Sequence, residues 1–112
     1  MTPEGLTKQE IKKLLDSYGD ALYYFMPVQS GYGTRTIDFL ICFRGRFIAV
    51  EAKREGARAA RFQQRILDGI SKAGGLAFCV DTAEELKTVF AWLTAEELKT
   101  VLVECGMTHK PT

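Results

Sequence analysis

Three charged residues interrupt two otherwise apolar runs near the middle of the chain. Asp38 lies in the run of residues 36–43, and Glu51 and Lys53 lie in the run of residues 47–53. Charged side chains inside buried strands are costly unless they are paired or bind a metal. These three residues are therefore the first candidates for a chemical role.

The turn between the two runs decides whether these charges meet. A two-residue loop at residues 44–45 would place Asp38 directly opposite Glu51, with Cβ atoms about 5 Å apart. Alternation along a strand puts Lys53 on the same face as Glu51. A three-residue loop would instead shift the pairing by one and place Asp38 and Glu51 on opposite faces.

Two facing carboxylates repel each other unless a positive charge sits between them. Hard oxygen ligands at this spacing suit Mg²⁺ or Mn²⁺, and the backbone carbonyl of Ala52 is a further candidate ligand. Lys53 could orient or help deprotonate a water and stabilise negative charge on a phosphorane-like transition state. The alternative is that Asp38 closes the preceding loop, while Glu51 and Lys53 lie on a solvated strand face.

The elements that must position these residues follow from periodicity and turn signals. Thr7 and Glu10 match a capping box that would begin a first helix. An apolar stretch with the pattern of a strand precedes the two runs that contain the charged residues. A basic helix that ends at two glycines follows these runs. The next apolar strand is of the kind buried in a sheet covered on both faces. We expect helices at residues 7–19 and about 57–73, and strands at residues 21–26, 37–43, 47–53 and 76–81.

The C-terminal part contains the octapeptide TAEELKTV twice, at residues 82–89 and 94–101. Each copy matches a capping box, and a spacing of twelve residues would rotate the second copy by about 120° on one helix. We therefore expect two short helices, broken near Thr94. The whole chain is expected to form a single domain, residues 1–112, with a core of about residues 7–93 and a helical extension at residues 94–112.

Composition excludes several classes of protein. The hydrophobic and charged fractions, 46% and 26%, are those of a soluble globular protein, and the net charge is +1. The N-terminus has no apolar signal segment, and no run approaches the roughly 20 residues of a membrane span. Three widely spaced cysteines are read as small buried hydrophobes in a reducing compartment. The expected location is the cytoplasm, of a bacterium or of a phage-infected host, with no membrane and no organic cofactor.

The order of these residues resembles the PD-(D/E)XK nuclease superfamily, and is closest to its VRR-NUC branch. The matching features are a D-x(12)-E-A-K pattern from Asp38 to Lys53, a helix with glutamines, its closing Gly-Gly and the next apolar strand. The resemblance covers about residues 33–81 and is strongest to small stand-alone phage and bacterial forms. One departure is Thr36 and Ile37, where many relatives have Gly and Pro. The fold implied is α/β, with a restriction-endonuclease-like core whose mixed β-sheet contains an antiparallel hairpin flanked by helices, and with extra C-terminal helices.

Carried over by position, the resemblance makes Asp38 and Glu51 metal ligands and Lys53 the catalytic lysine. The helix glutamine of the family points to Gln63, with Gln64 the weaker candidate. Family members also place a glutamate of the first helix at the metal site. Glu10 is the first choice for that ligand, although it could serve only the capping box, and Glu4 is a less favoured substitute. The implied cofactor is Mg²⁺ or Mn²⁺.

Arginines surround the proposed site in sequence. Arg58, Arg61 and Arg65 follow i, i+3, i+7 spacing, so they would form one helical stripe. With Arg54 and Arg35, such a stripe suits the phosphate backbone of DNA, and the alternative is a solvated helix face. Arg44 and Arg46 at the hairpin tip could add contacts.

The resemblance implies a metal-dependent DNA endonuclease that acts on branched DNA such as four-way (Holliday) junctions. Stand-alone members of this size resemble homodimers, and two cuts on opposing strands would need two sites related by two-fold symmetry. Two alternatives are a nucleic-acid-binding module that keeps the fold without cutting, and a repair or restriction-type nuclease with another DNA substrate.

Overall fold

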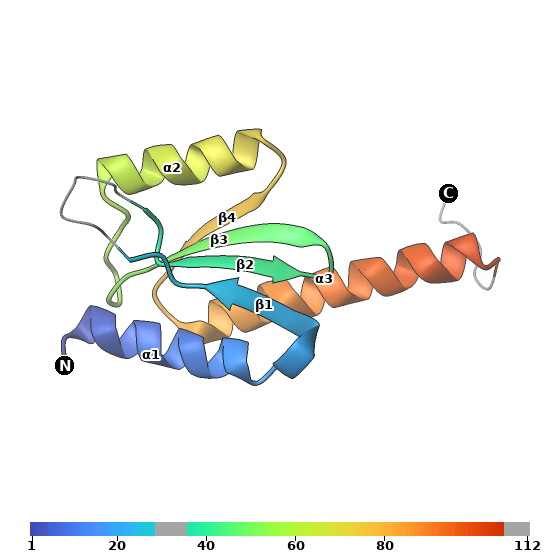
Figure 1. The fold of residues 1–112 in the computed structure, drawn as a ribbon, viewed down its shortest axis with the longest axis horizontal. Helices are drawn as coiled ribbons and strands as arrows, with labels where there is room; N and C mark the ends of the chain where they lie inside the picture. Colours follow the sequence, from blue (N-terminus) through green and yellow to red (C-terminus); the bar gives the residue numbers. More distant parts are fainter. Residues whose placement is uncertain (29–35, 107–112) are drawn as a thin grey trace.

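The computed structural model describes residues 1–28 and 36–106. Three helices and four strands follow one another in the predicted order: helix, three strands, helix, strand and helix (Figure 1). A short 3₁₀ turn, η1, separates the first helix from the first strand. The elements are α1 (Pro3–Asp16), η1 (Gly19–Ala21), β1 (Leu22–Phe25), β2 (Phe39–Phe43), β3 (Arg46–Ala52), α2 (Arg61–Lys72), β4 (Leu76–Val80) and α3 (Ala83–Glu104).

The four strands form one mixed sheet in the order β1-β2-β3-β4. The pairs β1–β2 and β2–β3 are antiparallel, whereas β3 and β4 are parallel and are connected through α2. This confirms the predicted α/β architecture, in which a hairpin and a parallel pair are flanked by helices. The arrangement is compatible with a restriction-endonuclease-like core.

The β2–β3 hairpin has the two-residue loop on which the predicted site depends. Phe43 pairs with Arg46, and Arg44 and Gly45 form the turn with φ of 52° and 75°. Two consecutive left-handed residues are the mark of a type I′ turn, whose twist matches that of the strands. Since the ladder continues to the pair Phe39–Val50, the predicted register is confirmed.

Helices cover both faces of the sheet (Figure 1). On one face, α1 and α3 pack against β2 and β3 and form the main hydrophobic core, which includes Ile11, Ile48, Val50, Leu86 and Phe90. On the other face, Leu67 of α2 packs with Ala49 and Ile37. Odd-numbered residues of β3 therefore face α2, and this is the face on which Glu51 lies.

Helix α1 begins earlier than predicted. Thr2 is its N-cap and accepts a hydrogen bond from the Gly5 N–H at 3.0 Å, and Pro3 occupies the first turn. Thr7 is buried inside the helix and donates to the Pro3 carbonyl at 3.3 Å. The predicted capping box of Thr7 and Glu10 is therefore wrong, because proline favours the first helical turn and fixes an earlier start.

The C-terminal segment is one helix, not two. Thr82 caps α3 by accepting from the Glu85 N–H at 3.4 Å, as predicted. Thr94 lies inside the helix, where its hydroxyl donates to the Phe90 carbonyl at 2.9 Å. The predicted break near Thr94 is wrong, because a threonine can satisfy its hydroxyl within a continuous helix.

Two further expectations are corrected, and one is confirmed. Helix α2 begins at Arg61 rather than near Ala57. Strand β4 lies at an edge of the sheet and is mostly half-buried, but Phe78 packs toward the core of α1 and α3 and Ala77 packs toward α2, so both faces of the strand are covered, as predicted. Cys42 and Cys105 are exposed rather than buried, and Cys79 is half-buried. Cys42 lies on the sheet face toward α2, but that helix packs against β3 and β4 rather than over this part of β2.

Within the residues that the structure describes, no helix combines the length and the apolar composition needed to cross a membrane.

Candidate functional site

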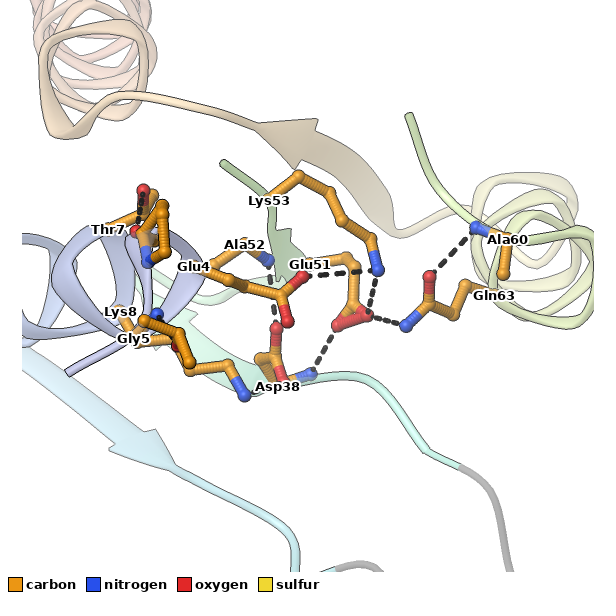
Figure 2. A network of polar contacts seen from close by, with 12 residues as sticks. Glu4, Gly5, Thr7, Lys8, Asp38, Glu51, Ala52, Lys53, Ala60 and Gln63 are labelled. Atoms are coloured by element: carbon orange, nitrogen blue, oxygen red, sulfur yellow. Dashed lines mark hydrogen bonds and ion pairs between the residues drawn. The ribbon is translucent and has the colours of Figure 1, made fainter. Parts of the chain in front are cut away.

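Asp38 and Glu51 face each other at the open end of the hairpin and are linked by reciprocal bonds to the backbone. The Ala52 N–H donates to Asp38 Oδ2 at 2.9 Å, and the Asp38 N–H donates to Glu51 Oε1 at 3.2 Å (Figure 2). Each carboxylate thus accepts a bond from the strand that carries the other. The predicted meeting of the two carboxylates is present in the structure.

Glu51 is the most deeply buried charged residue of the site, with only 1% of its surface exposed. Burial, together with the hydrogen bond and negative charge of Asp38, raises the pKa of Glu51 from 4.5 to about 8. The Asp38 N–H and the Lys53 ammonium oppose this shift. A buried carboxyl group with a raised pKa gives up its proton readily only when another positive charge binds in place of the proton.

Gln63 reaches the site from the first turn of α2. Its Nε2 donates to Glu51 Oε2, and its Oε1 accepts from the Ala60 N–H at 2.9 Å. Gln63 is buried, whereas Gln64 is exposed and pairs with Asp68. The choice of Gln63 over Gln64 agrees with these contacts. Because the partner of its Nε2 is Glu51, Gln63 holds that carboxylate in place.

Lys53 follows directly on β3, and its backbone N–H donates to the Val80 carbonyl at 2.9 Å. This bond fixes the backbone beside β4. The ammonium lies 3.3 Å from Glu4 Oε1 and 4.0 Å from Glu51 Oε2 (Figure 2). Lys53 therefore sits beside the carboxylate pair, as predicted from the alternation of β3.

Helix α1 contributes Glu4 and Lys8 to the site. Lys8 Nζ lies 3.0 Å from Asp38 Oδ1. Burial lowers the pKa of Lys8, but the hydrogen bond to Asp38 and the nearby negative charges outweigh it and raise the pKa above its ordinary value. The sequence did not point to Lys8. The available signal was its i, i+4 spacing from Glu4, which puts both side chains on one face of a helix.

The contacts favour Glu4 over Glu10 as the carboxylate that α1 brings to the site. Six residues separate the two, a rotation of about 240° around the helix. Glu10 is exposed and lies on another side of α1, whereas Glu4 reaches Lys53. Because α1 starts at Pro3, Glu4 lies in the first turn of the helix rather than before it.

The predicted arginines are distributed differently from the expected stripe. Arg61 and Arg65 lie one turn apart on α2, and both are exposed. Arg58 precedes the helix, so the three residues do not form one helical stripe. Arg54 and Arg58 instead line an open hollow of about 360 Å³, together with Glu4 and Lys53. This hollow connects the lysine with solvent.

Two other arginines, both described by the structure, do not join the site. Arg44 and Arg46 lie at the hairpin tip, at the opposite end of β2 and β3 from Asp38 and Glu51. Arg44 forms an ion pair with Glu97 of α3 at 2.8 Å. Arg35 lies outside the described residues.

The donor set can be compared with what a metal ion requires. Among residues 1–28 and 36–106, no group of three or more His, Cys, Asp and Glu side chains is arranged to hold a metal. Mg²⁺, however, keeps several waters and often uses only one or two protein carboxylates. Asp38 and Glu51 bring two carboxylates together, which is the donor chemistry of such a site, although in this structure each of their oxygens already has a partner within the protein. The role of the Ala52 carbonyl as a further metal ligand stays a prediction.

Comparison of the chain with protein-family models, with curated proteins and with solved structures finds no match.

Proposed function

We propose that the chain is a metal-dependent endonuclease that hydrolyses phosphodiester bonds in DNA. The observation that carries the proposal is the meeting of Asp38 and Glu51 across the hairpin, with Lys53 beside them. Two carboxylates and a lysine that converge in this way can serve metal-assisted hydrolysis, and the lysine also lines the open hollow.

In this proposal Asp38 and Glu51 hold Mg²⁺ or Mn²⁺. The ion would supply Lewis-acid activation of water and neutralise charge on the phosphate. Gln63 fixes one oxygen of Glu51, so that the carboxylate keeps one orientation toward Asp38. Lys53 orients the attacking water and stabilises negative charge as the phosphate is attacked, since its ammonium lies at the edge of the hollow.

The substrate side of the proposal rests on exposed positive charge around that hollow. Arg54 and Arg58 line it, and Arg61 and Arg65 follow on α2. Guanidinium groups bind phosphates in bidentate fashion and give no base readout by themselves. Recognition of DNA shape, as in a four-way junction, is therefore the form of selectivity that we propose.

We propose that the active form is a two-fold dimer that contacts its partner through the second half of α3. This half projects beyond the sheet (Figure 1). Leu86, in the first copy of TAEELKTV, is fully buried, whereas its counterpart Leu98 is 58% exposed and Val101 is 46% exposed. A second copy of the chain supplies an identical apolar stripe, and two sites would allow cuts on opposing strands.

The test is incubation of the purified protein with labelled four-way junction, flap, nicked and linear duplex DNA. Each substrate is tested with Mg²⁺, with Mn²⁺ and with EDTA. We expect metal-dependent cleavage, fastest on the branched substrates. Absence of cleavage of all four substrates with either metal would refute the nuclease, and binding without cleavage would favour a non-cleaving module.

Lys53→Ala separates catalysis from binding. We expect cleavage to slow by about 100-fold or more, because the variant removes the ammonium that stabilises developing charge. Binding of the same DNA in EDTA should change little. Lys87→Ala, at an exposed lysine of α3, is the control and should cleave normally. A normal rate for Lys53→Ala would show that the role given to Lys53 is wrong.

A further inference from the structure

Two side chains of α1 neutralise the charged residues of the hairpin. Lys8 pairs with Asp38 at 3.0 Å, and Glu4 pairs with Lys53 at 3.3 Å (Figure 2). The two ion pairs have opposite polarity, and both come from one face of the helix. The first turns of α1 therefore supply a positive charge to the carboxylate pair and a negative charge to the lysine.

Both oxygens of Asp38 are engaged in this arrangement. Oδ2 accepts from the Ala52 N–H, a group fixed by the sheet, and Oδ1 faces the Lys8 ammonium. A divalent cation at Asp38 would lie close to the Lys8 ammonium, and two positive charges at one carboxylate repel each other. The Ala52 N–H is uncharged and held in the sheet, so Lys8 is the partner that must leave.

The exposure of the two partners agrees with such an exchange. The side chain of Asp38 is only 12% exposed, whereas that of Lys8 is 38% exposed. An ammonium on a long, flexible stem can return to water at small cost, because it is strongly hydrated and its three donors find water readily. Asp38 would lose its counter-charge unless another cation arrives at the same time.

We infer that Lys8 is the resident counter-ion of the metal-free site and competes with the divalent cation for Asp38. Lys8 thereby sets the metal concentration at which the site fills. This inference rests on the proposed function, because it concerns the same pair of carboxylates. It assigns to α1 a regulatory contact that restrains metal binding.

The test measures Mn²⁺ affinity by isothermal titration calorimetry, without DNA. We expect Lys8→Gln to bind Mn²⁺ about fivefold more tightly than the wild type, the effect of losing one partly exposed ion pair. Lys8→Arg keeps the positive charge and should bind no more tightly than the wild type. Lys13→Gln removes the same charge from an exposed position of α1 and should leave the affinity unchanged.

A second readout separates competition from a merely structural role. Thermal unfolding should show that Lys8→Gln is less stable than the wild type without metal and gains more stability when Mn²⁺ is added. Equal loss of stability with and without Mn²⁺ would overturn the inference. Unchanged Mn²⁺ affinity in Lys8→Gln, with weaker DNA binding, would also overturn it and would make Lys8 a phosphate contact.

The same titrations distinguish failure of the inference from failure of the proposed function. Asp38→Asn should abolish Mn²⁺ binding in both the wild-type and the Lys8→Gln backgrounds. If the wild type binds Mn²⁺ and Lys8→Gln binds it equally well, the metal site stands and only the competition is refuted. If neither protein binds Mn²⁺, both the metal site and the inference are refuted.

Discussion

Glu51 makes the metal-free protein sensitive to pH. Its pKa is raised from 4.5 to about 8, first by burial and then by Asp38. Below pH 4.5 the group is protonated in both the folded and the unfolded chain, so its contribution to stability is fully present. As the pH rises from 4.5 to 8, the unfolded chain releases the proton first, and the free energy of unfolding falls.

We expect the metal-free wild type to lose stability relative to Glu51→Gln as the pH rises from 4.5 to 8, because the amide of the variant cannot ionise. The difference should be largest near pH 8 and amount to a few kcal/mol. Urea unfolding at a series of pH values in EDTA measures it. Glu55→Gln, at an exposed position of the same segment, should run parallel to the wild type, and a parallel curve for Glu51→Gln would contradict the shift.

Gln63 and Gln64 are neighbours with opposite environments. Gln63→Leu leaves one oxygen of Glu51 and the Ala60 N–H without their partner. The expected cost is about 1–3 kcal/mol of stability, as for other buried polar groups that lose a hydrogen bond.

Gln64→Leu removes only an exposed contact with Asp68 and should change the free energy of unfolding by about 0.5 kcal/mol or less. Urea unfolding of both variants provides the comparison. Equal effects would mean that the bond between Gln63 and Glu51 does not stabilise the fold.

At the scale of elements, the two copies of the octapeptide allow two threonines of the same local sequence to be compared. Thr82 begins the first copy and Thr94 begins the second. Thr82→Ala removes the N-cap of the helix and should destabilise the protein by about 1 kcal/mol. Thr94→Ala lies inside a continuous helix, where alanine has the higher propensity, so its effect should be close to zero. Thermal unfolding checks both variants. A cost for Thr94→Ala as large as that for Thr82→Ala would indicate a second helix start.

Some contacts of the site could be predicted from the sequence, and others could not. The position of Asp38 opposite Glu51 was predictable, because a two-residue turn with glycine fixes the register of the hairpin. The alternation of side chains along each strand then places both carboxylates on one face of the sheet. The contacts of Glu4 and Lys8 were not predictable, because they depend on how α1 docks across the sheet. Their positions on that helix depended in turn on whether it began at Thr2 or at Thr7.

The single α3 helix was missed for a related reason. A capping box is a local pattern, and the same letters at residues 82–85 and 94–97 have different surroundings. At Thr82 the preceding strand ends and the chain must turn, so the threonine caps. At Thr94 the preceding turn is already helical and packed through Phe90 and Leu93, so the helix continues. Packing of the preceding turn therefore decides whether the threonine caps a new helix or lies inside a continuous one.

At the scale of the whole molecule, the described part of the chain measures 53 × 28 × 27 Å. The long dimension reflects the projecting half of α3 (Figure 1). Leu98 and Val101 lie on that half and are about half exposed. Apolar side chains repeated on one side of a helix are typical of a helix that packs against a partner.

We expect the wild type to have a mass in solution twice the 12.5 kDa of one chain. The double variant Leu98→Glu/Val101→Glu should be monomeric, because it places two like charges in the proposed contact. Size-exclusion chromatography with light scattering measures both. Lys99→Glu makes the same change in net charge on another side of the helix and should stay dimeric. A monomeric wild type, or a dimeric double variant, would refute this interface.

The short turn of the β2–β3 hairpin also bears on the order of folding events. Hairpins closed by a few residues form within about 1–10 μs, and contacts close in sequence form with the least loss of chain entropy. Asp38 and Glu51 therefore meet early, whereas Lys8 reaches them only when α1 docks from thirty residues away. During that interval the nascent hairpin carries two facing carboxyl groups without their counter-ion. Only water and dissolved salt then screen the repulsion between them, until α1 docks and brings Lys8 to Asp38.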